Sequence, residues 1–119
     1  MIKQFRYATG ETLVEIPAGT IESGESPEEC AERELLEETG YSAEEFHLLS
    51  GCYTAPGYSN EIISIYLATK LNKIKDEPEE EGIHISIREF DEAIESISKE
   101  IIDAKSIIGL FLANRHIKK

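Results

Sequence analysis

The sequence predicts a single α/β or α+β domain, and three patterns support this prediction. Short apolar stretches with strand-like alternation recur along the chain, one helical pattern interrupts them near the middle, and another closes the chain. Strands interleaved with a few amphipathic helices pack in layers around one core. With 119 residues the chain can build one modest core. We therefore expect one domain, 1–119, with a mixed sheet and helices on both of its faces.

Strands are expected on both sides of the central helix. Two precede it, over residues 1–7 and 12–16, with a turn at 8–11 between them. After the helix, a short helical turn at 42–45 leads into strands at 48–54 and 61–71, which the loop 55–60 connects. The charged segment 70–82 contains Pro78 and predicts an exposed loop. Clean alternation of isoleucines then predicts a strand over 83–87.

Two helices are expected towards the end of the chain. Asp91 is a plausible N-cap for a short helix over 91–98. The last helix is expected from about residue 103 to 116, with an apolar stripe at helical spacing formed by Ile107, Ile108, Phe111 and Leu112.

The central helix has the clearest boundary signals. Ser26 can serve as its N-cap, Pro27 suits the first helical position, and Glu29 completes a capping box. Gly40 stands where a helix ends with a left-handed residue. We therefore expect a helix over residues 27–39.

This helix carries an unusual concentration of acidic side chains. Glu34, Glu37 and Glu38 are related by i, i+3 and i+4, so they share one face. Like charges at this spacing weaken a helix, whereas a hard cation such as Mg²⁺ would take their oxygens as ligands. On charge alone, a solvated acidic face is the commoner interpretation. The composition leaves both open.

Composition excludes several partner classes. The net charge of −12 argues against binding a nucleic-acid backbone, which needs Lys and Arg. A small polyphosphate remains compatible, because a bound metal can supply positive charge. No apolar run is long enough to span a membrane and no signal peptide opens the chain. Cys30 and Cys52 lack metal-site spacing and indicate small buried thiols in a reducing cytoplasm.

The order of the residues around the helix is more specific than their charge. Gly19 is followed after five residues by Glu25 and, after seven more, by Arg33-Glu34-Leu35-x-Glu37-Glu38-x-Gly40. This stretch from Gly19 to Gly40 resembles the Nudix box. Every charged and glycine position of that box is filled, and Tyr41 takes the last, usually aliphatic place. The resemblance implies an α/β/α sandwich and a hydrolase acting on nucleoside diphosphates linked to another moiety.

The resemblance also implies roles for residues of the box. Glu34 and Glu38 would bind Mg²⁺ or Mn²⁺ most directly, together with the carbonyl of Ala18. Glu37 and Glu38 would belong to the catalytic set. A third set is expected to orient or shape the site: Gly19, Glu25, Arg33 and Gly40. Arg33 would orient a glutamate such as Glu25, although a surface Arg among acids is an equally good interpretation.

Residues outside the box resemble the ADP-ribose pyrophosphatase branch of the family. They are Gln4-Phe5-Arg6, Glu15-Ile16-Pro17-Ala18-Gly19, Pro56 at 15 residues after Tyr41, Glu61 and Asp103-Ala104-Lys105-Ser106. In this branch the base is a glutamate on a mobile loop, and the matching stretch is Glu79-Glu80-Glu81. We expect Glu79 to be the base and Glu81 an auxiliary metal ligand. Arg6, Pro56 and Tyr58 are the substrate-binding candidates.

These observations lead to one main hypothesis and two alternatives. The main hypothesis is a Mg²⁺-dependent hydrolase that splits ADP-ribose into AMP and ribose 5-phosphate in the cytoplasm. One alternative is a Nudix enzyme for another nucleotide sugar or dinucleotide, such as GDP-mannose or NADH. The other is a non-hydrolytic nucleotide-binding or regulatory domain. Members of the branch usually carry an additional N-terminal sheet that helps build their dimer, so we expect a reduced form or a late start codon, and a homodimer stays open.

Overall fold

The computed structural model describes residues 1–119 as an α+β fold with two antiparallel sheets. The chain runs through β1 (Ile2–Arg6), β2 (Glu11–Glu15), α1 (Pro27–Thr39), β3 (Tyr41–Tyr53), β4 (Ile62–Lys73), β5 (Ile83–Ile85), α2 (Phe90–Glu95) and α3 (Ala104–Ile117). One sheet has the order β2-β1-β5, and β3 pairs with β4 in the other. The α+β class is therefore confirmed. The prediction of one mixed sheet is wrong, because the strands form two sheets and each pair of neighbouring strands is antiparallel.

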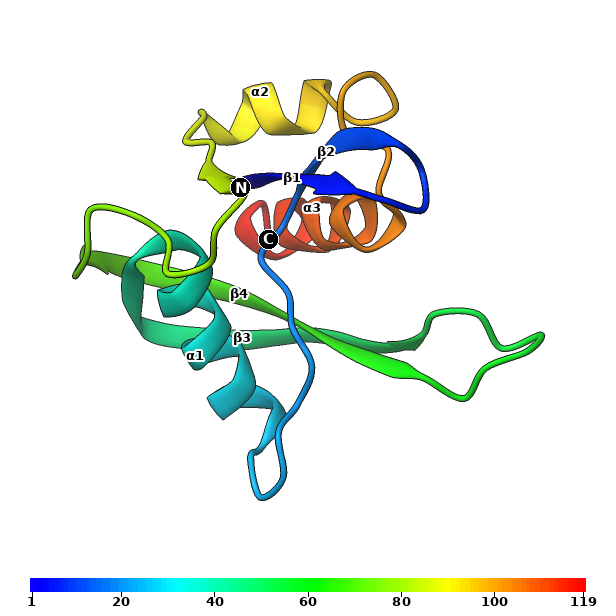
Figure 1. The fold of residues 1–119 in the computed structure, drawn as a ribbon, viewed down its shortest axis with the longest axis horizontal. Helices are drawn as coiled ribbons and strands as arrows, with labels where there is room; N and C mark the ends of the chain where they lie inside the picture. The colour runs from blue at the N-terminus through cyan, green and yellow to red at the C-terminus, as the bar shows by residue number, and fades with distance from the viewer.

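Helix α3 joins the two sheets. In Figure 1 it runs between the β1–β2 strands and the long β3–β4 hairpin, with α2 beyond the small sheet and α1 crossing the end of the hairpin where β3 begins. The close approach depends on a small residue, because a Cβ on Gly109 would stand 3.1 Å from Ile16 Cδ1 and 3.5 Å from Ile65 Cγ2. The main core cluster, Val14, Ala93, Ile101 and Leu110, lies on one side of this helix.

The face of α3 that is buried differs from the predicted stripe. The helix buries Ser106, Gly109, Leu110 and Ala113, whereas Ile108 is 39% and Phe111 55% exposed. The predicted stripe is confirmed only in part: Ile107 packs against the core cluster and Leu112 is half-buried. The contact with the sheets also requires small residues, which a search for large apolar side chains overlooks.

The hairpin also corrects the predicted element boundaries. Residues 42–45 are not a helical turn but part of β3, where Glu45 pairs with Thr69 across the ladder. Strand β4 continues to Lys73, into the segment expected to be a loop. Long cross-strand pairing outweighs local preference here, as tertiary context commonly does. Helix α2 begins at Phe90, one residue before the predicted N-cap Asp91, and ends at Glu95; β5 ends at Ile85.

The central helix is confirmed at both ends. Ser26 accepts a hydrogen bond from the backbone of Glu29, and the Glu29 side chain accepts one from the backbone of Ser26, which completes the capping box. Gly40 ends the helix with φ 76°. Its carbonyl accepts hydrogen bonds from Ile74 and Lys75 at 2.8 and 3.0 Å, so the chain leaving β4 packs directly on the helix end.

Gly40→Ala should lower the free energy of unfolding by about 3 kcal/mol, because it adds left-handed strain and a clash. The new Cβ would collide with the backbone carbonyl of Lys75, which a side-chain rotation cannot relieve. Gly24 is the matched control: it also has positive φ, at 79°, but open space around its Cα. Gly24→Ala should cost about 1 kcal/mol. Equal losses for the two variants in urea unfolding would show that the Lys75 contact is unimportant.

Candidate functional site

The site forms where the loop after β2 crosses the buried side of α1. The backbone N–H of Ala18 donates to Glu38 Oε2 at 2.9 Å, and the Glu38 side chain is buried. Gly19 passes so close to α1 that any Cβ on it would overlap the Glu34 carboxyl group. The Cys30 thiol lies 3.8 Å from the Gly19 carbonyl oxygen. Two backbone positions are thus fixed against two carboxylates of the helix.

Arg33 links acidic side chains of this helix and of the loop before it. Its guanidinium binds Glu25 through Nε at 2.7 Å and Nη2 at 3.1 Å. Nη1 donates to Glu34 at 2.8 Å and to Glu37 at 3.1 Å, and Nη2 also donates to the Thr20 carbonyl. The contact expected between Arg33 and Glu25 is therefore present, and the same guanidinium forms ion pairs with three further glutamates, Glu22, Glu34 and Glu37. Hydrogen bonds from Arg33 lower the pKa of Glu25 to about 2.

Glu38 has a different electrostatic environment. Burial, together with the charges of Glu34 and Glu80, raises the pKa of Glu38 to about 7, although the Ala18 N–H and Arg6 oppose the shift. Burial also raises the pKa of Glu34, partly offset by Arg33. No cationic side chain forms an ion pair with Glu38. The inner carboxylate of the cluster therefore lacks a cationic partner, whereas the outer ones have Arg33.

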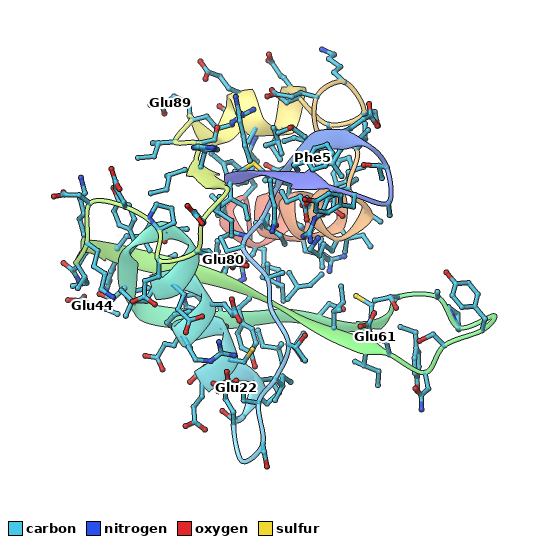
Figure 2. The ribbon with its side chains drawn as sticks, viewed as in Figure 1. Phe5, Glu22, Glu44, Glu61, Glu80 and Glu89 are labelled. Carbon is cyan, nitrogen blue, oxygen red and sulfur yellow. The ribbon has the colours of Figure 1, made fainter.

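The three loop glutamates lie differently from one another. Glu79 donates its backbone N–H to the Glu37 carbonyl at 2.8 Å, so the loop is attached to α1, but its carboxylate is ion-paired with Lys75. Glu80 is the one whose charge raises the pKa of both Glu34 and Glu38. Figure 2 shows Glu80 near the C-terminal end of α1, at the opposite end from Glu22. Glu81 is exposed. Sequence reasoning did not single out Glu80, because three adjacent glutamates look alike.

Of the three substrate-binding candidates, only Arg6 lies near the carboxylates. Its Nε and Nη2 donate to the two oxygens of Glu15 at 2.8 and 2.9 Å. Pro56 and Tyr58 lie in the connection between β3 and β4, at the far end of the hairpin from α1 (Figure 1), and Tyr58 is 91% exposed. The structure does not bring these two residues to the carboxylate cluster of the same chain.

Sequence reasoning assigned no role in the site to Glu15 and Lys105. Glu15 accepts hydrogen bonds from Arg6 and, at 2.6 Å, from Lys105 Nζ, although only 2% of its side chain is exposed. Burial alone would raise the pKa of Glu15, but hydrogen bonds from Arg6 and Lys105 lower it below its ordinary value. The signal available in the sequence was the place of Glu15 in the stretch Glu15-Ile16-Pro17-Ala18-Gly19, which leads into the box.

A cavity of about 540 Å³ lies between the loop after β2, α1, β4 and α3. Apolar side chains of β4, α1 and α3 form most of its wall, while Ala18, Gly19, Glu34 and Lys105 also line it. This volume is within the range of small-molecule sites, which combine apolar walls with a few polar groups.

The donor chemistry fits a hard divalent cation, although the side chains are not gathered around one point. Carboxylates on Glu34 and Glu38 and a backbone carbonyl at Ala18 are the oxygen ligands that Mg²⁺ takes. No group of three or more His, Cys, Asp or Glu side chains is arranged as a ready metal site. Glu38 instead accepts a hydrogen bond from the Ala18 N–H. Its raised pKa, with no cationic side chain paired to it, is the electrostatic condition that a cation would relieve.

The fold and the site together define an α+β domain in which an acidic, capped helix and the glycine loop before it share one cavity. The NUDIX domain family model matches residues 1–107, so this chain belongs to that family. None of the helices α1, α2 and α3 has the length and apolar character of a membrane span.

Similarity to individual proteins extends over most of the chain. An ADP-ribose pyrophosphatase from Bacillus subtilis (strain 168) is 40% identical over 114 residues, which cover 92% of this chain and 62% of that protein. A GDP-mannose pyrophosphatase from Yersinia enterocolitica is 37% identical, covering 98% of this chain and 66% of that protein. A solved structure of an ADP compounds hydrolase superposes with a TM-score of 0.83 at 27% identity, covering 98% of this chain and 64% of that one. The chain thus spans less than two thirds of these relatives.

Stability in metal-free buffer should depend on pH through Glu38. Its pKa of about 7 lies above the ordinary value of 4.5, so its contribution to stability is full below pH 4.5 and is lost as the pH rises through 7. Between these pH values the wild type should lose up to about 3 kcal/mol relative to Glu38→Gln, which cannot ionise. Urea unfolding with EDTA across this range measures the difference. Parallel pH curves for the two proteins would show that Glu38 titrates normally.

Proposed function

We propose that this domain is a Mg²⁺-dependent hydrolase that splits ADP-ribose into AMP and ribose 5-phosphate. The observation that carries this proposal is the fixed position of the Ala18-Gly19 backbone against Glu34 and Glu38. The reaction adds water across the diphosphate: one P–O bond forms, the bridging P–O bond breaks, and the proton of the water must be removed. The domain offers carboxylates for that proton and a cavity beside them.

In the proposed site Glu34, Glu38, the Ala18 carbonyl and, when the loop closes, Glu81 would hold Mg²⁺ or Mn²⁺. The ion would supply the positive charge that diphosphate oxygens need and would lower the pKa of a bound water. Glu37 and Glu38 belong to the catalytic set, and Arg6 contacts the substrate phosphate through its guanidinium. Gly19, Glu25, Arg33 and Gly40 keep the loop and helix in place. Pro56 and Tyr58 lie away from the carboxylates of their own chain (Figure 1). We therefore propose that they contact the substrate only in a homodimer, in the site of the other subunit.

The relatives support the proposed substrate class. An ADP-ribose pyrophosphatase at 40% identity favours ADP-ribose, and a GDP-mannose pyrophosphatase at 37% supports the alternative of another nucleotide sugar. Both are nucleoside diphosphates linked to a sugar. With no cysteine in a disulfide, we also propose a reducing, cytoplasmic location.

Incubation with Mg²⁺ and ADP-ribose should yield AMP and ribose 5-phosphate, and EDTA should abolish both products. Chromatography of parallel reactions with GDP-mannose, NADH and a nucleoside triphosphate measures the preference. Glu38→Gln is expected to lower kcat by about 10²-fold or more, because it removes a charge from the metal-binding set. Cleavage of another substrate in preference to ADP-ribose would correct the substrate. No cleavage of any of them would favour a non-hydrolytic binding domain.

The base should be identifiable from three single variants of the loop, Glu79→Gln, Glu80→Gln and Glu81→Gln. We propose Glu79, whose variant should lose about 10²- to 10³-fold in kcat at neutral pH. Glu80 is the second candidate, because its charge already acts on Glu34 and Glu38. The three variants are matched in charge and are adjacent in sequence. A large loss confined to Glu80→Gln would move the base to that residue.

A further inference from the structure

Four charged side chains form a series of ion pairs where β1, β2 and α3 meet: Arg6, Glu15, Lys105 and Asp103. Glu15 receives the forked guanidinium of Arg6 from one side and Lys105 Nζ from the other. The same Lys105 nitrogen donates to Asp103 Oδ2 at 2.9 Å. Two cations and two carboxylates thus balance, and Glu15, which binds both cations, is almost wholly buried.

This set is connected to the backbone that reaches the acidic helix. Asp103 caps α3 and accepts a hydrogen bond from the Ser106 hydroxyl at 2.6 Å. Ser106 is fully buried, and its hydroxyl oxygen accepts from the Ile16 N–H at 2.9 Å. Ile16 is two residues before Ala18, whose N–H donates to Glu38. The N-terminal turn of α3 therefore holds the end of β2 and, through it, the loop that touches Glu34 and Glu38.

We infer that Lys105 is a positioning residue for substrate binding, which acts through Glu15 to aim the Arg6 guanidinium at the substrate diphosphate. This inference rests on the proposed function and on the proposed phosphate contact of Arg6. Glu15 takes the Nε–H and one Nη2–H of Arg6, so the guanidinium keeps both N–H groups of Nη1 and one of Nη2 for a phosphate. The direction of the guanidinium is then set by the orientation of the Glu15 carboxylate, which Lys105 fixes from the opposite side.

A direct role of Lys105 as a phosphate ligand is less compatible with its contacts. Two of its three N–H donors are engaged by Glu15 and Asp103, and hydrogen bonds to both keep its pKa above the ordinary value despite burial. Moving Nζ to a ligand would leave the buried Glu15 with one cation fewer, which is costly in a low-dielectric interior. Arg6 can bind a phosphate without giving up Glu15.

Lys105→Met should weaken binding of the diphosphate by about tenfold and leave kcat within about twofold, because it changes ground-state positioning rather than the reacting groups. The readouts are KM and kcat, and the Kd of α,β-methylene ADP-ribose with Mg²⁺ by calorimetry. In this analogue carbon replaces the bridging oxygen, so it is not cleaved. Lys105→Arg should restore KM and Kd to within about threefold, because it keeps a cationic donor at Glu15. Lys99→Met, on an exposed residue, is the matched control and should change neither.

A double-mutant cycle with Arg6→Lys distinguishes positioning from charge. If Lys105 acts through the Arg6 fork, Lys105→Met should cost less than about twofold in Kd in the Arg6→Lys background, where the fork is already lost. An equal loss in both backgrounds would overturn the inference, because an effect through space does not need Arg6. A fall in kcat with unchanged KM and Kd would overturn it as well. Should Lys105→Met not fold, Lys105→Gln, which keeps a donor without the charge, takes its place in the cycle.

The proposed function and this inference fail separately. Wild-type protein that leaves ADP-ribose intact refutes the proposed substrate, and the cycle is then measured on whichever nucleoside diphosphate of the panel the wild type splits or binds. Wild-type protein that splits ADP-ribose while Lys105→Met keeps its KM and Kd supports the function and refutes the inference. Binding of no diphosphate by the wild type overturns both.

Discussion

The structure depends on the contact between the Ala18-Gly19 backbone and the buried side of α1. A hydrogen bond to Glu38 and the absence of a side chain at Gly19 allow a loop and an acidic helix to share one wall of a cavity. Several features converge on this contact: the capping box fixes where the helix begins, Gly40 fixes where it ends, and Ser106 holds the strand that feeds the loop. Because these constraints come from distant parts of the chain, the site is a product of the whole fold.

Charge is distributed unevenly around this contact. A chain with a net charge of −12 places Arg33 among the outer glutamates, and Arg6 with Lys105 around Glu15. Each buried or half-buried carboxylate in these two groups has a cation, as burial of charge requires. Glu38 is the exception, since its hydrogen bond comes from a neutral backbone amide. The fold thus pairs Glu15, Glu25, Glu34 and Glu37 with a cation and leaves Glu38 without one.

Local signals were sufficient for the acidic helix but not for its surroundings. The N-cap, the capping box and the terminal glycine lie within a few residues of one another, and the structure has helix α1 with the expected bounds, Pro27–Thr39. The helical turn expected at 42–45 failed because the β3–β4 ladder forms across more than twenty residues. The buried face of α3 was predicted only in part, because Ser106 and Gly109 lie on it as small residues that allow close packing, and hydrophobic spacing does not detect them. The same limit applies to the site: adjacency in sequence could group Glu79 with Glu80, but only the fold shows that one pairs with Lys75 while the other acts on Glu38.

The uncompensated Glu38 has a consequence for any cation bound beside it. With a pKa of about 7, this carboxyl group holds a proton for much of the time near neutral pH. A cation must displace that proton, so its affinity would fall as the pH drops below 7 and level off above it. Burial therefore acts in two directions: it raises the free energy of the bare carboxylate, and it strengthens the attraction for a cation once one arrives. Glu25 shows the contrast, because Arg33 holds its pKa near 2 and leaves it no proton to exchange. Glu34 lies between these two extremes, because Arg33 contacts it while burial still raises its pKa.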